Sequence, residues 1–297
     1  MRSFKVSCVI IIAIVFWASA FVGIRIGLAG YSPGALALLR FIVASLCMLV
    51  IYYSLGIKKR VVWKDRIQLL LAGMAGIGIY NICLNYGELS VSAGIASFVI
   101  GLMPVMTVLL SLVFLREKLT RGVWFGIFIS ILGLALLAIG ESSEPGMQQG
   151  ILAILVSALM GAILTIIQKQ FVSVYHPVAI IAWVMWGGTL LLALFLPDML
   201  QQIQSADFQT TAAVIYMGIF PAALAYLAWG YVLKYLSASN ASITLYALPI
   251  VSTLMGVFFL DEHISLRSLA GCTITLLGAF VANHFQMRRK ANLGTQS

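Results

Sequence analysis

One stretch of the chain occurs twice, and this duplication constrains the fold more than any other feature. Residues 92–133 and 237–278 align at a constant offset of 145, which brings a proline, a glutamate and two glycines into register. The matched pairs are Ser92/Ser237, Ala93/Ala238, Ala96/Ala241, Ser97/Ser242, Pro104/Pro249, Leu109/Leu254, Phe114/Phe259, Leu115/Leu260, Glu117/Glu262, Gly126/Gly271 and Gly133/Gly278. Apolar composition alone would not place these residue types in register, so the chain is a tandem duplication.

The composition requires a bilayer. Of the 297 residues, 62% are hydrophobic and 9% are charged, whereas a soluble domain carries about 25% charged residues. The four cysteines, Cys8, Cys47, Cys83 and Cys272, lie inside apolar runs without a CxxC pair. Such thiols act as small hydrophobic groups rather than as disulfide or metal ligands. We therefore expect an all-α integral membrane protein that takes no metal and no cofactor.

The apolar runs divide into ten lengths of about 20 residues, each enough to cross a membrane. The predicted spans lie near 6–28, 34–55, 67–87, 92–115, 121–140, 149–170, 178–197, 210–234, 238–260 and 266–286. The least distinct boundary separates the third span from the fourth at 88–91. A cleavable signal peptide is not predicted, because the first apolar run is too long for one.

Basic residues predict the orientation. With both termini cytoplasmic, fifteen of the eighteen Lys and Arg residues fall in or beside cytoplasmic segments, as the positive-inside rule requires. The net charge of +9 then indicates contact with anionic membrane lipids and no nucleic acid. Five spans per repeat is an odd number, so the second copy enters the membrane inverted, as in many secondary transporters.

Several short motifs resemble the drug/metabolite transporter superfamily, specifically its ten-helix group built from two EamA-type halves. The supporting residues are Phe16–Phe21 (FWASAF), Leu38–Phe41 (LLRF) and the proline-to-glutamate spacing that occurs in both halves. The resemblance implies a first repeat at 1–140, an external linker at 141–148, a second repeat at 149–286 and a basic cytoplasmic tail at 287–297. It also implies a carrier of small solutes in the bacterial inner membrane that often exports amino acids or related metabolites.

Few polar groups lie at membrane depth, where each needs a partner or a function. Arg40 is expected either to receive a substrate carboxylate or to form an ion pair with Glu88 that holds two helices together. Arg25 and Glu88 are expected to form an outer gate or a structural ion pair, although Arg25 could also extend to the surface. Asn81 and Asn85 share one helix face at i, i+4 spacing.

We predict a substrate site near the midplane, between the two halves. Its expected residues are Trp17, Arg40, Tyr80, Asn81, Asn85, Gln168, Trp183, Tyr226, Asn240 and Tyr246. For the aromatic members, ordinary packing against helix or lipid is the alternative. Pro104 and Pro249 each free a backbone carbonyl, and they are expected to be paired hinges or, alternatively, static kinks. Glu117 and Glu262 are expected to cap helices or form loop salt bridges, with proton coupling as the alternative.

These features predict a secondary transporter with alternating access that exports amino acids or related zwitterions or carboxylates. A multidrug or cation exporter is the alternative, and an acidic residue in the cavity would favour it. A membrane enzyme or assembly protein is a further alternative, but the sequence has no phosphate loop, no metal-ligand spacing among its histidines and no carboxylate near a helix centre. Coupling to a proton or another ion stays open. Rows of small residues are expected to pack the chain's own helices, which favours a monomer or a weak homodimer.

Overall fold

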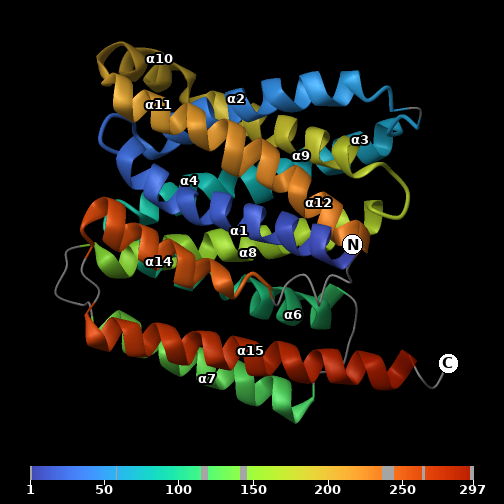
Figure 1. Cartoon of the computed structure of the whole chain (residues 1–297), viewed down its shortest axis with the longest axis vertical. Helices are drawn as coiled ribbons and strands as arrows, with labels where there is room; N and C mark the ends of the chain where they lie inside the picture. The colour runs from blue at the N-terminus through green and yellow to red at the C-terminus, as the bar shows by residue number, and fades with distance from the viewer. Residues whose placement is uncertain are drawn as a thin grey trace.

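The chain is described here from a computed structural model. The structure describes residues 2–57, 59–114, 120–140, 146–235, 244–262 and 265–294, and within these ranges it contains helices and turns but no β-strand. Figure 1 shows the helices stacked roughly side by side in layers.

The first half begins with two long helices. They are α1 (Arg2–Gly27) and α2 (Pro33–Ser54). Ser32 caps the start of α2, because its Oγ accepts a hydrogen bond from the Ala35 N–H, and Pro33 occupies the first turn, where no backbone donor is needed. The remaining elements of this half are α3 (Trp63–Gly73), the π-helix η1 (Met74–Ile79), α4 (Tyr80–Gly87), α5 (Ala93–Ile100), α6 (Met103–Phe114) and α7 (Arg121–Gly140).

The second half follows a similar order, with two short elements inserted after its second helix. Its elements are α8 (Met147–Phe171), α9 (Pro177–Leu192), the short 3₁₀ helix η2 (Ala193–Phe195), α10 (Leu196–Ser205), α11 (Phe208–Met217), the π-helix η3 (Gly218–Leu224), α12 (Ala225–Tyr235), α14 (Ala247–Leu260) and α15 (Leu266–Gly294). Of the two inserted elements, α10 lies where we predicted a connection after residue 197. This helix is amphipathic, with Met199 buried while Gln201 and Gln204 are exposed.

Six helical segments of the described chain are long and apolar enough to cross a membrane. They cover 5–27, 33–54, 63–87, 147–171, 177–205 and 208–232, which correspond to six of the predicted spans. The other four predicted spans contain shorter apolar helices at 93–107, 121–136, 247–260 and 269–282. The total of ten spans stays a prediction. The least distinct predicted boundary is present as a turn at 88–91.

The helices run between two ends of the molecule. Both termini lie at one end (Figure 1), which we call the termini end. The opposite end, called the distal end, carries the turns at 28–32, 88–92 and 206–207. By the predicted orientation, the termini end is cytoplasmic and the distal end external.

The two halves keep the duplicated register in three dimensions. The π-helices cover 74–79 and 218–224, so an offset of 145 places them in equivalent positions. Gly73 packs against the backbone of Val184 on α9, and its counterpart Gly218 packs against the backbone of Arg40 on α2. At both glycines a Cβ atom would collide with a carbonyl oxygen. Each half therefore brings its π-helix into backbone contact with the second helix of the other half.

Two tyrosines connect the halves in the same paired way. The Tyr31 hydroxyl lies 2.8 Å from Thr211 Oγ1 at the distal end. Tyr175 follows Tyr31 at an offset of 144, and its hydroxyl donates to Asp65 Oδ2 (2.6 Å). This hydrogen bond raises the pKa of the Tyr175 hydroxyl. The pairing extends the duplication to the first part of each half, where the sequences match less well.

The repeated prolines stand at helix interruptions rather than inside bent helices. Pro104 lies in the first turn of α6, after the chain leaves α5 at Ile100, and Pro249 lies in the first turn of α14. A first-turn proline loses no backbone hydrogen bond. The two interruptions meet, because Gly101 lies close to the Pro249 ring. Their role as hinges stays a prediction.

Helices α7 and α15 form a layer through rows of small residues. Gly126 faces the backbone of Gly278 and Ala282, and Gly133 faces that of Gly271 and Thr275. Ser130 Oγ also donates to the Thr275 carbonyl (3.1 Å). The row of small residues thus packs two helices of the same chain, as the sequence predicted.

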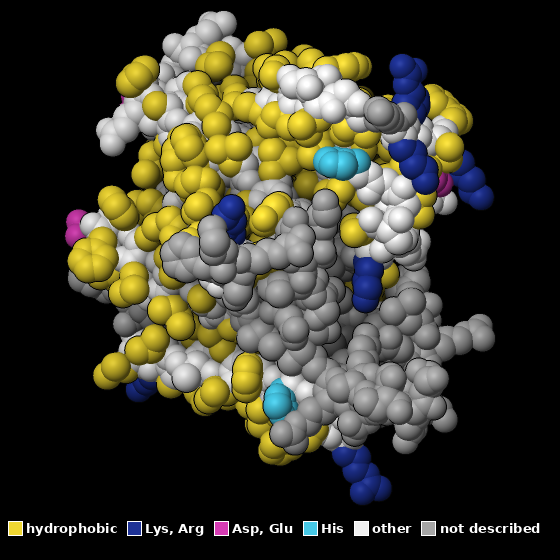
Figure 2. Space-filling model, turned by 45° about the vertical axis from the view of Figure 1, so that its right-hand side comes forward, with side chains coloured by type: hydrophobic (Ala, Val, Ile, Leu, Met, Phe, Trp, Pro, Cys, Tyr) yellow, Lys and Arg dark blue, Asp and Glu magenta, His cyan; other side chains and the backbone are white. Residues whose placement is uncertain are grey.

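The outer surface of the helices is apolar. Exposed side chains include Val50 on α2, Phe128 on α7 and Phe258 on α14. Figure 2 shows hydrophobic side chains spread over the molecule, with most of the visible Lys and Arg side chains toward the right-hand side. This distribution suits a lipid-facing flank with charged groups at an end.

We expect Gly126→Leu to separate α7 from α15, because no space exists for a side chain between the two backbones. Overpacking of this kind costs about 1–3 kcal/mol of folding free energy, so Tm should fall. Thermal unfolding of the purified protein measures the effect. Thr273→Leu, at an exposed position of α15, is the matched control. Equal Tm values for both variants would contradict the described packing.

Candidate functional site

Arg40 is the charged group at the centre of the candidate site. It lies two turns into α2, about 10 Å along the axis from the start of the helix, and it is 5% exposed. Its Nη1 donates a hydrogen bond to Asn81 Oδ1 on α4 (3.2 Å). Its Nε finds no hydrogen-bond acceptor among the described residues. A buried guanidinium with a free donor is suited to bind an anionic group.

Asn81 and Asn85 both face α2, as their i, i+4 spacing predicted. Asn81 Nδ2 donates to the Ile77 carbonyl inside η1 (2.8 Å), which fixes the amide that holds Arg40. Asn85 Nδ2 donates to the Pro33 carbonyl at the start of α2 (2.9 Å). Asn81 therefore orients the charged group, whereas Asn85 ties α4 to α2.

The π-helix η1 sets the position of Tyr80, the first residue of α4. Ser157 on α8 donates its Oγ hydrogen bond to the Tyr80 carbonyl (2.7 Å), and the Tyr80 ring lies next to Gly161 of the same helix. The first half is thus joined to the second directly beside Asn81. A π-helix widens one turn of a helix and is frequent at functional sites.

Aromatic side chains from both halves meet beside Arg40. Trp17 on α1 packs edge-on against Tyr226 of α12, with ring centroids 5.7 Å apart, and its ring lies 5.4 Å from that of Trp229. The hydroxyl groups of Tyr80 and Tyr226 lie within electrostatic range of the Arg40 guanidinium. We call Trp17, Arg40, Tyr80, Asn81 and Tyr226 the central cluster. It combines one cation, one amide and three aromatic rings.

Three other predicted site residues, Gln168, Trp183 and Tyr246, lie away from the central cluster. Gln168 lies in the last turn of α8 at the termini end. Trp183 lies in the second turn of α9, against Trp186 and under the Arg66 guanidinium. Tyr246 faces Phe280 of α15, with ring centroids 6.2 Å apart. Asn240 and Glu117 lie outside the described residues.

At the distal end, Arg25 joins three segments. Its Nη1 donates to the main-chain carbonyl of Glu88 (2.5 Å), and its Nε lies 3.9 Å from Glu262 Oε1. We predicted an ion pair between Arg25 and the Glu88 side chain. The ion pair instead joins Arg25 to Glu262, since the end of α14 places the Glu262 carboxylate beside α1.

Glu262 also caps a helix of the first half. Its carboxylate accepts hydrogen bonds from the N–H groups of Ala93 (2.8 Å) and Gly94 (3.3 Å) at the start of α5. A carboxylate is favourable there because it satisfies free backbone donors and meets the positive end of the helix dipole. The capping role predicted for this glutamate is present, and the helix that it caps belongs to the other repeat. We call Arg25, Glu262 and residues 88–94 the distal clasp.

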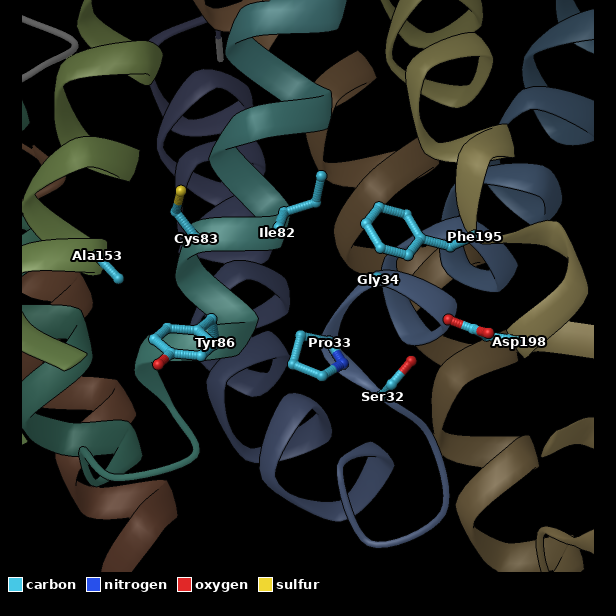
Figure 3. A pocket seen from close by; sticks show the side chains of 9 residues that line it. All are labelled: Ser32, Pro33, Gly34, Ile82, Cys83, Tyr86, Ala153, Phe195 and Asp198. Atoms are coloured by element: carbon cyan, nitrogen blue, oxygen red, sulfur yellow. The ribbon is translucent and has the colours of Figure 1, made fainter. Parts of the chain in front are cut away.

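A separate groove lies at the distal end between α2, α4, α8 and α10 (Figure 3). Its volume is about 340 Å³, and its wall is mainly apolar. Ser32, Tyr86, Phe195 and Asp198 are among the residues that line it, and Figure 3 shows the Phe195 ring above Gly34. No member of the central cluster lines this groove.

Within the described part of the chain, no group of three or more His, Cys, Asp and Glu side chains could hold a metal ion. The central cluster offers a charge, hydrogen-bonding groups and aromatic surface for recognition of a ligand.

Long apolar helices and a polar cluster shared by the two halves define a multi-pass membrane protein of duplicated build. The model of the EamA-like transporter family matches residues 4–139 and again 148–283. The chain belongs to this family, which confirms the resemblance found in the sequence.

Curated relatives share nearly the full length. An uncharacterized transporter of Archaeoglobus fulgidus is 36% identical over 92% of this chain and 96% of its own. A probable terminal-alkyne amino-acid exporter of Streptantibioticus cattleyicolor is 30% identical over 99% of each chain. A probable amino-acid metabolite efflux pump of Salmonella typhimurium is 25% identical over 95% of this chain and 96% of its own.

A solved crystal structure matches this fold with a TM-score of 0.64. It covers 96% of this chain and 98% of its own at 20% sequence identity. At this identity the match supports the fold alone.

Sequence reasoning missed two features of the site. The π-helices were not predicted, although Pro221 inside η3 is a signal of irregular backbone. The partner of Glu262 was also missed, because nothing in the sequence places residue 262 next to residue 93. For the π-helices, the constant offset of the repeat was the available signal that a feature of one half recurs in the other.

We expect Glu262→Ala to destabilise the protein by about 0.5–2 kcal/mol, since it removes the cap of α5. Glu262→Gln keeps one acceptor oxygen for the Ala93 N–H. It loses the longer hydrogen bond from the Gly94 N–H and the charge that pairs with the partly exposed Arg25, an ion pair that contributes about 0–1 kcal/mol. Denaturant or thermal unfolding in detergent would therefore rank wild type, E262Q and E262A in that order. An E262A protein as stable as wild type would show that the clasp contributes nothing to stability.

Proposed function

We propose that this transporter exports amino acids or related zwitterions and carboxylates by alternating access between its two halves. The observation that supports this most is the buried Arg40 guanidinium, whose Nε has no acceptor among the described residues. A solute carboxylate would supply that acceptor. The Trp17 and Tyr226 rings would then cover the apolar part of the solute.

The inverted repeat supports the alternating-access part of the proposal. The central cluster takes Trp17, Arg40 and Asn81 from the first half and Tyr226 from the second. A movement of one half against the other would open the cluster first to one end and then to the other. Such a movement would break contacts between the halves at both ends. These contacts are the distal clasp at one end and the Tyr175–Asp65 hydrogen bond at the other.

The relatives' names support the solute class. Two of them are named as a probable amino-acid exporter and a probable amino-acid metabolite efflux pump. With relatives named as transporters, we propose no enzymatic activity for this chain. We place both termini on the cytoplasmic side of a bacterial inner membrane and take the protein as a monomer or weak homodimer in contact with lipids.

A cation exporter would be favoured by an acidic residue in the cavity. Glu88 is a buried carboxylate near Arg40, and the Arg25 guanidinium also attracts it electrostatically. With two guanidinium groups around one such carboxylate, the site does not favour a cationic solute over a carboxylate.

The solute class can be tested with the purified protein in liposomes. We expect saturable exchange of small amino acids and of related carboxylates, measured with labelled solute on one side. Transport of quaternary ammonium compounds without any transport of amino acids would contradict the proposal.

Arg40→Gln tests the carboxylate-binding role. A hydrogen bond to a charged group contributes about 1.5–3 kcal/mol, so the variant should weaken solute binding by about ten- to a hundredfold. Arg40→Lys keeps the charge without the planar fork and should retain part of the affinity. The effect should appear in KM for carboxylate solutes. Arg121→Gln, which removes an exposed arginine of α7, is the control, and equal KM values in R40Q and R121Q would contradict the assignment.

A further inference from the structure

Glu88 has an environment unlike that of any other described carboxylate. It follows α4 directly and is 0% exposed. Its main-chain carbonyl accepts the hydrogen bond of Arg25, while its N–H donates to the Leu84 carbonyl (3.0 Å). Neither carboxylate oxygen receives a hydrogen bond from the described residues. The side chain is therefore buried without partners inside the distal clasp.

The charged groups that act on Glu88 come from three elements. In decreasing order they are Arg25 of α1, Glu262 after α14 and Arg40 of α2. Arg25 donates to the Glu88 carbonyl and pairs with Glu262, and Arg40 donates to Asn81. From α8, the uncharged residues Gly150 and Ile154 pack against Gly87, the residue before Glu88. The two cations thus lie near Glu88 while their hydrogen bonds go to other atoms.

This geometry favours the neutral form of the side chain. An ionised carboxylate here has lost its water and gained no hydrogen bond, which is far more costly than burial of a neutral carboxyl group. When the distal end opens, water can reach the side chain and stabilise the charge. If closure favours protonation, protonation must favour closure to the same extent, because linkage is reciprocal.

We propose that Glu88 is a proton-binding site of the transport cycle, and that closure of the distal clasp over Glu88 takes up one proton. Opening of the clasp releases this proton to the solution at the distal end, so a higher proton concentration there favours the closed clasp. This proposal rests on the proposed function, because alternating access requires a state in which the distal clasp is open. Because Glu88 and Arg40 lie within electrostatic range of each other, occupancy of either site changes the affinity of the other.

A spectroscopic test addresses the proton directly. Infrared difference spectra of the full chain in lipid nanodiscs report the C=O stretch of protonated carboxyl groups. At neutral pH we expect a carboxylic-acid band that Glu88→Gln removes. Asp207→Asn is the matched control, since Asp207 is exposed at the distal end and caps α11 through the Thr210 N–H, a role that asparagine also fills. If E88Q removes no such band, Glu88 is ionised in the closed protein and the proposal is overturned.

A distance measurement tests the link to closure. Spin labels are placed at Ala29 and Leu266, which are exposed at the distal end on opposite halves, after replacement of the four native cysteines. Electron–electron resonance distances are recorded from about pH 4 to about pH 8, which spans the usual range of carboxyl and histidine titration. We expect the short-distance population to rise as pH falls, with at most a tenfold change in the closed-to-open ratio per pH unit for one proton.

The variants distinguish Glu88 from other titrating groups. E88Q should show the closed distance at every pH, E88D should keep a pH dependence, and D207N should titrate like wild type. A wild-type distribution that does not change with pH, or an E88Q protein that titrates like wild type, would overturn the proposal. Neither readout requires a solute, so failure to transport amino acids would contradict the proposed function while leaving this test intact.

Discussion

The structure depends on the requirement that backbone polar groups inside a bilayer find partners within the protein. Irregular backbone in the described part of the chain includes the two π-helices and the interruptions before Pro104 and Pro249. Each of these segments packs against another helix of the protein. The Ser157 hydroxyl and the Asn81 amide bind carbonyls at η1, and the two proline interruptions meet each other. The same side chains that satisfy the backbone also position the central cluster, so stability and site geometry share one set of contacts.

The backbone repeats more faithfully than the side chains. The π-helices and their contact glycines occupy equivalent positions in both halves, yet the residue equivalent to Arg40 at an offset of 144 is Val184. The central cation therefore comes from one half only. Under the proposed function, this single charged group would let an approximately symmetric framework hold a solute carboxylate in one orientation.

Much of the fold could be predicted from the sequence, because apolar run length and the repeat report it directly. The predicted boundary at 88–91 is a local feature, and it is present as a turn. Helix α10 was missed because a short amphipathic helix has no long apolar run. Gln168 and Trp183 were grouped with Arg40 although both lie toward the termini end, whereas Arg40 lies two turns from the distal end of α2. The helical rise alone separates these positions by many ångströms. The burial of Glu88 and the cap from Glu262 depend on contacts between distant segments, which no local pattern contains.

Gly73 contacts α9 and Gly218 contacts α2 in the same way. These paired contacts affect the free-energy difference between the two arrangements of the halves that alternating access requires. Each contact is a local copy of the other, so exchanging the conformations of the halves replaces one set of contacts with a nearly equivalent one. The backbone then contributes little difference between the two states, and side chains found in one half only decide the balance. A difference of about 1.4 kcal/mol changes the population ratio tenfold. A single charge or a single proton is large enough on this scale to set the resting state.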